Sequence, residues 1–140
     1  MRVLCVCLGN ICRSPAAEAA LRDRGVDVDS AGTAGWHVGK PPYQPMQEAG
    51  LTIGRNLSTL RARQFTTTDF HDFDLILGMD EENLSDIERL RPAGSTTPVQ
   101  LFADKAVPDP YYTRDFDGAW MMIEEAADAL VSRKTVVPAS

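Results

Sequence analysis

The sequence predicts an α/β fold in which a doubly wound, four-stranded parallel sheet carries helices on both faces. The pattern of the chain predicts the fold class, and its length predicts the number of domains. Four short apolar runs alternate with helix-like segments along the chain, which is typical of a parallel sheet covered on both sides. The length of 140 residues, without an internal repeat, low-complexity segment or linker, indicates one domain over residues 1–140.

The first elements are a strand and a helix joined by a tight turn. Val3–Val6 is a short apolar run typical of a buried strand, and the residues "LGN" end it. Ser14 is a good N-cap and Pro15 suits the first helical position, so we expect a helix from there. Gly25 is expected to stop this helix.

The middle of the chain alternates strands with short helices around one long loop. In order, we expect a strand at 26–32, a helix at 46–51 ended by Gly50, a turn or short helix at 66–73 and a strand at 74–78. The segment 32–45 is rich in glycine and proline. A loop of that length inside a compact domain is often functional.

The last third completes the alternation. We expect a helix at 80–92 stopped by Pro92, a strand at 97–102, a loop at 103–115 and a helix at 117–133. The last helix has an apolar face formed by Phe116, Trp120, Ile123, Ala127 and Leu130. The tail over 134–140 is expected to fray.

The composition argues against several classes of function. With 14 basic and 20 acidic residues the formal net charge is −6, so the chain lacks the basic surface that nucleic acids and anionic membranes attract. No apolar run is long enough to cross a bilayer, and the N-terminus lacks the apolar core of a signal peptide. We therefore expect a cytoplasmic protein without nucleic-acid or membrane partners.

All three cysteines, Cys5, Cys7 and Cys12, lie near the N-terminus. An odd, clustered set does not indicate a disulfide framework in a reducing compartment. No second Cys or His pair has the spacing of a zinc site, so no metal is predicted. The two histidines, His37 and His71, have no identifiable partner and are interpreted as non-catalytic.

The segment from Cys7 to Ser14 carries the strongest functional signal. A strand ends, a turn follows and a helix begins, so backbone N–H groups can converge on one anion, for which phosphate is suited. Gly9 allows a close backbone approach, and Asn10 tolerates a left-handed conformation. Arg13 can hold two phosphate oxygens, and the positive environment favours a thiolate at Cys7. The segment therefore predicts an activated nucleophile facing a phosphate.

Longer stretches of the sequence resemble one known family. Cysteine, five residues, arginine and serine follow one another within "VLCVCLGNICRSPAAEAALR", and "DSAGTAGWHVGKPP", "ARQF…DF..FDLILGMDEENL" and "DPYY" come later in that order. Over nearly the whole chain this resembles the low-molecular-weight protein tyrosine phosphatases. The resemblance implies a phosphate loop after the first strand and hydrolysis of phosphotyrosine through a phosphocysteine, without metal or cofactor.

The resemblance assigns catalytic roles to three residues. Cys7 is similar to the nucleophile, and Arg13 to the residue that binds the phosphate and the transition state. Asp109 is similar to the general acid, later the base, because a phenol with a pKa near ~10 leaves poorly as an anion. The phosphate-binding residues would be Leu8, Gly9, Asn10, Ile11, Cys12, Arg13 and Ser14.

The other site residues form a pocket and a support. The aromatic walls of the family's deep pocket correspond to Trp36, Tyr111 and Tyr112. The groups that hold the loop correspond to Asn10, Ser14 and Ser30. Asp80 ends a predicted strand at the functional edge of the sheet, so it is a candidate support of the loop.

The cysteines divide into separate roles. In the family, paired cysteines form a reversible disulfide under peroxide, and the resemblance implies this for Cys7 and Cys12. Cys5 lies in the predicted strand and is expected in the core.

The resemblance also implies a tyrosine-phosphorylated protein substrate, a bacterial tyrosine kinase as a possible partner, and a monomer or weak dimer.

Two positions depart from the family pattern. Where relatives usually continue "VGKPP" with Asp-Pro-Arg, this chain has Tyr43, Gln44 and Pro45. Where many members carry a histidine that braces the phosphate loop, this chain has Leu60. The role of that histidine is not transferred, and the bracing network is expected to be rebuilt.

Three other functions stay open at this level. A protein arginine phosphatase is a close relative, although that group tends to carry threonine where this loop has Ile11. An arsenate reductase shares the fold, but its thioredoxin-linked form needs a cysteine pair that is absent after Cys12. A phosphotyrosine-binding module without activity would not need a nucleophile, an arginine and an acid together.

Overall fold

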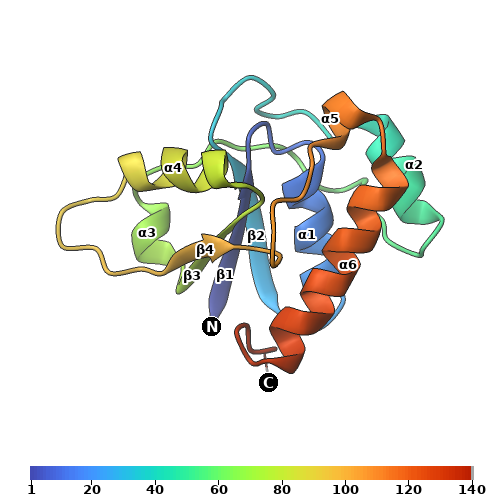
Figure 1. The fold of residues 1–140 in the computed structure, drawn as a ribbon. Coiled ribbons are helices and arrows are strands. Elements are labelled where there is room, and N and C mark those ends of the chain that lie inside the picture. The colour runs from blue at the N-terminus through green and yellow to red at the C-terminus, as the bar shows by residue number, and fades with distance from the viewer. Residues whose placement is uncertain (140) are drawn as a thin grey trace.

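The sheet is formed by parallel strands in the order β2-β1-β3-β4. The computed structural model describes residues 1–139 (Figure 1). The strands are β1 (Arg2–Cys7), β2 (Asp27–Gly32), β3 (Leu75–Gly78) and β4 (Val99–Leu101). Because β1 pairs with both β2 and β3, the first strand lies in the middle of the sheet. The predicted four-stranded parallel sheet is confirmed.

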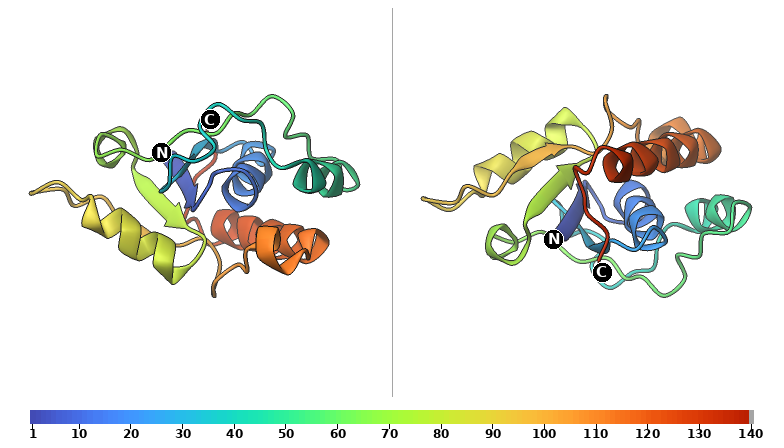
Figure 2. Two further views of the ribbon diagram at one scale, coloured as in Figure 1. Left: turned by 90° about the horizontal axis from the view of Figure 1, so that it is seen from above. Right: turned by 90° about the horizontal axis from the view of Figure 1, so that it is seen from below.

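Helices cover both faces of the sheet (Figure 2). On one face lie α1 (Arg13–Arg22) and α6 (Phe116–Ser132), with α2 (Gln44–Leu51) packed against α6. On the other face lie α3 (Asp69–Asp72) and α4 (Glu81–Arg89). The remaining helix, α5 (Pro110–Thr113), lies just before α6. The fold is therefore doubly wound, as predicted.

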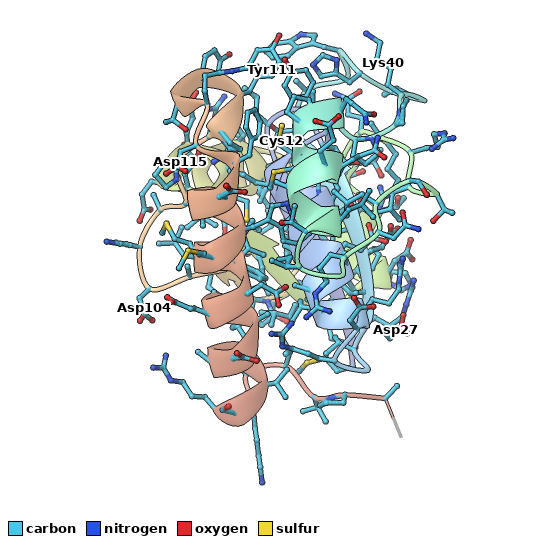
Figure 3. The ribbon with its side chains drawn as sticks, turned by 90° about the vertical axis from the view of Figure 1, so that its right-hand side faces the viewer. Cys12, Asp27, Lys40, Asp104, Tyr111 and Asp115 are labelled. Carbon is cyan, nitrogen blue, oxygen red and sulfur yellow. The ribbon has the colours of Figure 1, made fainter. Side chains whose placement is uncertain are left out.

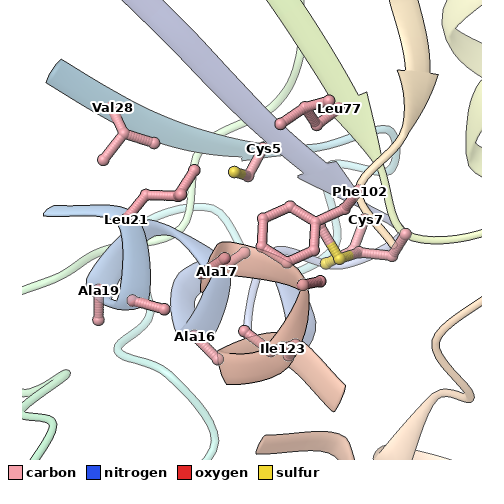
Figure 4. Packing of buried hydrophobic residues seen from close by; sticks show 14 of the residues in the cluster. Cys5, Cys7, Ala16, Ala17, Ala19, Leu21, Val28, Leu77, Phe102 and Ile123 are labelled. Carbon is pink, nitrogen blue, oxygen red and sulfur yellow. The ribbon is translucent and has the colours of Figure 1, made fainter. Parts of the chain in front are cut away.

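Strand β1 is buried from both sides by these helices. Val3 and Cys5 belong to the core cluster that contains α1 and α6, whereas Leu4 and Val6 belong to the cluster on the other face. This alternation is the period-two pattern of a strand. Figure 4 shows the sulfur of Cys5 directed toward Leu21 of α1, so the prediction that Cys5 is a core residue is confirmed.

The predicted cap of α1 is wrong. The N-cap is Cys12 rather than Ser14, and no side chain caps the helix. Ser14 lies inside the first turn, because its hydroxyl bonds to Cys7 and Asn10 instead of to the helix backbone. The helix ends at Arg22, ahead of Gly25, which has a φ of 85° in the turn that follows.

Gly50 does not end a helix, contrary to the prediction. It lies within α2, where an added Cβ would come within 2.7 Å of the Trp120 ring. Trp120 is almost fully buried and donates from its indole nitrogen to the carbonyl oxygen of Met46 at 3.0 Å. Glycine is therefore required for the close packing of α2 on α6, and the predicted core position of Trp120 is confirmed.

Two segments predicted as irregular are more ordered than expected. The loop at 103–115 contains α5 (Pro110–Thr113), which is followed by Arg114 in a left-handed conformation with a φ of 63°. The tail at 134–140 does not fray over its described part. Val136 is fully buried in the core, and the backbone N–H of Ala139 donates to the oxygen of Gly25 at 2.8 Å. Residue 140 lies outside the described residues.

Over residues 1–139, no helix combines the length and the apolar character that crossing a membrane requires.

Candidate active site

The loop after β1 meets the N-terminus of α1 at the carboxyl edge of the sheet. Asn10 has a φ of 57°, the left-handed conformation predicted for it. The loop packs directly on β2, where a Cβ at Gly32 would lie 2.8 Å from the oxygen of Leu8 and 3.0 Å from the nitrogen of Asn10. A side chain at position 32 would therefore displace the loop.

A pocket of about 170 Å³ opens over this loop. Figure 3 shows Cys12 and Tyr111 at the same end of the molecule, opposite the end at which Asp27 begins β2. The residues lining the pocket are Cys7, Leu8, Gly9, Ile11, Cys12, Arg13, Trp36, His37, Asp109, Tyr111 and Tyr112. Sequence reasoning named all of these as site residues except His37.

The sulfur of Cys7 is buried and lies within hydrogen-bond distance of two polar groups. The backbone N–H of Asn10 donates to it at 3.3 Å. The hydroxyl of Ser14 lies 3.0 Å from it. Hydrogen-bond donors that converge on a sulfur stabilise its anionic form, so this geometry suits a thiolate.

Arg13 is held between two carboxylates. Its Nη1 donates to Asp80 Oδ2 at 2.7 Å and to the carbonyl oxygen of Val107 at 3.0 Å, and Nη2 donates to Asp109 Oδ2 at 3.4 Å. Burial lowers the pKa of Arg13, but the Cys7 sulfur, Asp80 and Asp109 together raise it above its usual range. The guanidinium therefore remains charged beside the sulfur.

The two carboxylates each connect Arg13 to the start of a helix. Asp80 is the N-cap of α4 and accepts from the N–H of Asn83 through its other oxygen at 2.7 Å. Asp109 is the N-cap of α5 and accepts from the N–H of Tyr111 at 3.0 Å. The backbone of α5 thus fixes the orientation of Asp109 toward the pocket.

Aromatic side chains form the rim of the pocket. Trp36, Tyr111 and Tyr112 are 67, 42 and 71% exposed and stand around the opening. His37 is the lining residue that sequence reasoning missed: a Cβ at Gly9 would lie 2.9 Å from its Cδ2. Its position directly after Trp36 in the glycine-rich loop was the only available signal.

Behind the loop, three of the four predicted support residues, Asn10, Ser14 and Ser30, form one network. Asn10 Nδ2 donates to Ser14 Oγ at 2.8 Å and to Ser30 Oγ at 3.0 Å. Two contacts of this network were not predicted: Ser30 Oγ donates to Glu18 Oε1 at 2.6 Å, and the N–H of Arg63 donates to Asn10 Oδ1 at 3.0 Å. Leu60 packs against the core and supplies no polar group to the network.

Tyr43 joins the phosphate loop to α5. Its backbone N–H donates to the oxygen of Ile11 at 2.8 Å, and its ring centroid lies 5.2 Å from that of Tyr111. The guanidinium of Arg114 lies 5.4 Å from the centre of the Tyr43 ring and donates to the Tyr43 hydroxyl at 3.2 Å and to the oxygen of Tyr111 at 3.3 Å. The aromatic residue at this departure from the family pattern therefore packs beneath α5.

Replacing Tyr43 by alanine is expected to destabilise the protein by about 1–3 kcal/mol, since it removes aromatic and cation–π contacts at a partly buried site. Urea denaturation followed by circular dichroism measures the free energy of unfolding. Tyr43→Phe is the matched control, because it keeps the ring and loses only the hydroxyl contact. Equal stability of the two variants would contradict the role of the ring.

The second pocket cysteine has a different environment from the first. Burial raises the pKa of Cys12, and the negative charges of Cys7 and Asp109 raise it further. Burial likewise raises the pKa of Cys5. Both therefore favour the thiol form. Over residues 1–139, no group of three or more His, Cys, Asp or Glu side chains is placed to hold a metal ion.

Comparisons with known proteins agree with this geometry. The profile of the family described as low molecular weight phosphotyrosine protein phosphatase matches residues 2–137. The low molecular weight protein-tyrosine-phosphatase YfkJ of Bacillus subtilis is 38% identical, with 93% of each chain covered. The low molecular weight phosphotyrosine protein phosphatase of Schizosaccharomyces pombe is 43% identical over 80% of this chain and 81% of its own.

The fold of this chain agrees with that of solved crystal structures. The crystal structure of Primo-1 superposes with a TM-score of 0.89 at 36% identity, covering 96% of this chain and 99% of the other. The crystal structure of YfkJ superposes with a TM-score of 0.87, also at 36% identity, covering 96 and 94%. With the family profile spanning nearly every residue, the chain belongs to the low molecular weight phosphotyrosine protein phosphatase family.

Proposed function

We propose that the protein hydrolyses phosphotyrosine in proteins through a phosphocysteine formed on Cys7. The observation that carries the proposal is the convergence of Cys7, Arg13 and Asp109 on one pocket with an aromatic rim. A thiolate, a fixed cation and a carboxyl group are the parts that a phosphate monoester reaction needs.

In the first step, the Cys7 thiolate attacks phosphorus while the bond from phosphorus to the phenolic oxygen breaks. Arg13 and the loop N–H groups bind the equatorial phosphate oxygens, where negative charge is concentrated in the transition state. Asp109, as the protonated acid, donates its proton to the leaving oxygen. The products of this step are a free tyrosine hydroxyl and phospho-Cys7.

In the second step, water attacks phosphorus and the bond from phosphorus to sulfur breaks. Asp109, now a carboxylate, accepts a proton from the water, and inorganic phosphate leaves. Ser14 Oγ lies 3.0 Å from the sulfur and donates to the departing thiolate. The cycle returns Asp109 to its acid form and Cys7 to its anion.

The pocket favours an aryl phosphate over the alternatives. A phosphotyrosine ring is long enough to pass between Trp36 and Tyr111 and bring its phosphate to the loop, whereas phosphoserine is shorter. Ile11 lines the pocket and narrows the space for a planar guanidinium, which disfavours phosphoarginine. No cysteine follows Cys12, so the relay of a thioredoxin-linked arsenate reductase is absent.

A substrate panel assayed on one preparation tests the assignment. We expect a phosphotyrosine peptide to be hydrolysed faster than phosphoarginine or phosphoserine, with no reduction of arsenate. If phosphoarginine is hydrolysed faster than the phosphotyrosine peptide, the protein is an arginine phosphatase. If arsenate is reduced, the protein is an arsenate reductase. The Cys7→Ser protein supplies the background rate.

The cellular setting follows the same proposal. The substrate would be a tyrosine-phosphorylated protein in the cytoplasm, with a bacterial tyrosine kinase as the enzyme it opposes, and the phosphatase would act as a monomer or weak dimer. Under peroxide, Cys7 would be oxidised to a sulfenic acid. The sulfur of Cys12 would then attack the Cys7 sulfur and displace its hydroxyl group, giving a disulfide and water. This protective disulfide between Cys7 and Cys12 remains a prediction.

A further inference from the structure

Arg114, the residue that follows α5, takes no part in the proposed mechanism. Its φ of 63° is left-handed, a conformation that glycine adopts freely and that costs most other residues conformational energy. Glycine is also the usual residue where a helix ends in this conformation. An arginine at this position therefore calls for an explanation in the contacts of its side chain.

The side chain of Arg114 folds back over α5 and reaches Tyr43. Its Nη1 donates to the carbonyl oxygen of Tyr111 at 3.3 Å and to the hydroxyl of Tyr43 at 3.2 Å. The guanidinium also lies 5.4 Å from the centre of the Tyr43 ring and 5.1 Å from that of the Phe116 ring. One cation therefore contacts the backbone of α5 and two aromatic rings that lie outside this helix.

Tyr43 in turn is anchored to the phosphate loop. Its backbone N–H donates to the oxygen of Ile11 at 2.8 Å, and Ile11 lines the pocket. Its carbonyl oxygen accepts from the backbone N–H groups of Met46 and Gln47, at 2.9 and 3.0 Å, in the first turn of α2. The backbone of Tyr43 is thus fixed by the loop and by a helix, and its ring is a firm support for Arg114.

Hydrogen bonds between side chains attach α5 and its two flanking residues to the rest of the described chain at two places. Asp109 accepts from Arg13 at 3.4 Å, and Arg114 donates to Tyr43 at 3.2 Å. The ring of Tyr111 packs on that of Tyr43, with centroids 5.2 Å apart. Tyr111 is therefore placed through Tyr43 and Arg114, whereas Asp109 has a partner of its own.

We propose that Arg114 is a positioning residue for the aromatic rim: by linking the backbone of α5 to Tyr43, it holds Tyr111 where the aryl group of a bound ligand contacts it. The affinity for the aryl part of a ligand then depends on Arg114, whereas the affinity for its phosphate does not. The link is a feature of this chain, because Tyr43 departs from the family pattern. The proposal rests on the proposed function only in placing an aryl phosphate in this pocket.

Glycine at position 114 removes the link and suits the backbone. Arg114→Gly loses the hydrogen bonds and the ring contacts of the guanidinium, while a φ of 63° becomes unstrained. Lys134→Gly is the matched control, because Lys134 has a left-handed φ of 59° and also carries a positive charge. It lies just beyond the end of α6 that is remote from α5 (Figure 1).

Two ligands that are not hydrolysed separate the rim from the phosphate loop. Calorimetric titration with benzylphosphonate measures the affinity for an aryl ligand, and titration with tungstate measures the affinity for an oxyanion alone. For Arg114→Gly we expect the Kd of benzylphosphonate to rise roughly three- to tenfold, and the Kd of tungstate to stay within about twofold. For Lys134→Gly both Kd values should stay within about twofold of those of the unmodified protein.

A second variant tests the link from its other end. Tyr43→Phe keeps the ring and the charge of Arg114 but loses the hydroxyl that accepts from it. We expect this change to raise the Kd of benzylphosphonate about two- to threefold in the unmodified protein, and to add nothing in Arg114→Gly, where the contact is already absent. Equal effects in the two backgrounds would overturn the proposal, because the hydroxyl would then act independently of Arg114.

Two other results would contradict the positioning role. The charge of Arg114 reaches the pocket, because it opposes the rise that burial causes in the pKa of Cys12. If Arg114→Gly raised both Kd values by a similar factor, this charge would be attracting the oxyanion. If neither Kd changed while the thermal midpoint fell further than in Lys134→Gly, Arg114 would serve only the fold. Either result overturns the proposal.

A replacement is available if Arg114→Gly does not fold. Arg114→Asn removes the same guanidinium, and asparagine also tolerates the left-handed conformation. The titrations with benzylphosphonate and tungstate are then made on this variant, with the same expected and opposing results.

The titrations also separate this proposal from the proposed function. A protein that does not hydrolyse phosphotyrosine, but whose Arg114→Gly variant loses affinity for benzylphosphonate alone, would support the role of Arg114 and contradict the substrate assignment. A protein that hydrolyses phosphotyrosine, while its Arg114→Gly variant binds benzylphosphonate like the unmodified protein, would do the reverse.

Discussion

Cys7→Ser is expected to lower the turnover of p-nitrophenyl phosphate by roughly 10⁴-fold or more, because a serine hydroxyl is a far weaker nucleophile than a cysteine sulfur. Binding of a phosphate analogue should persist, since Arg13 and the loop N–H groups that hold the anion are unchanged. Steady-state kinetics measure the first quantity. Calorimetric titration with tungstate measures the second.

Cys5→Ala is the matched control for this variant. Cys5 is fully buried in the core, away from the pocket lining, so the variant should retain kcat within about twofold while losing some stability. Full turnover by Cys7→Ser would contradict the nucleophilic role. Loss of both turnover and tungstate binding would show instead that the loop had collapsed.

Asp109→Asn is expected to slow the hydrolysis of phenyl phosphate by about 10²–10⁴-fold, the usual contribution of a general acid. The variant's hydrolysis of esters of more acidic phenols should slow far less, because their leaving groups need no proton. Asparagine is as good an N-cap as aspartate, so α5 should keep its position in the variant. The measurement is kcat/KM across a series of aryl phosphates with different leaving-group pKa values.

Asp80→Asn provides the comparison for this series. Asp80 contacts Arg13 rather than the leaving group, so its loss should slow every ester by a similar factor. A uniform loss in the Asp109 variant, independent of the leaving group, would contradict its role as the acid.

The fold class and the loop from Cys7 to Ser14 were predictable because they depend on residues that lie close together in the sequence. The apolar strand, the glycine and asparagine turn and the helix after it lie within 22 residues of the N-terminus, and the left-handed φ of 57° at Asn10 follows from its local chemistry. The same local reasoning failed at Ser14. Its hydroxyl is used by Cys7 and Asn10, a choice that only the folded loop determines.

Residues that depend on long-range contacts were missed. Glu18 is an ordinary helical glutamate in the sequence, and only the position of β2 brings Ser30 to it. His37 reaches the pocket through the path of a long loop. Val136 is buried because the chain after α6 turns back onto the core, where a local pattern predicts a free end.

The most direct test of phosphoryl transfer to Cys7 is to trap the intermediate. The Asp109→Asn protein, mixed with p-nitrophenyl phosphate, whose leaving group needs no proton, and quenched in acid, should carry one phosphoryl group, located on Cys7 by peptide mass spectrometry. The slowed second step should make this species accumulate. A phosphoryl group on any other residue, or phosphate released without a labelled enzyme, would contradict the mechanism.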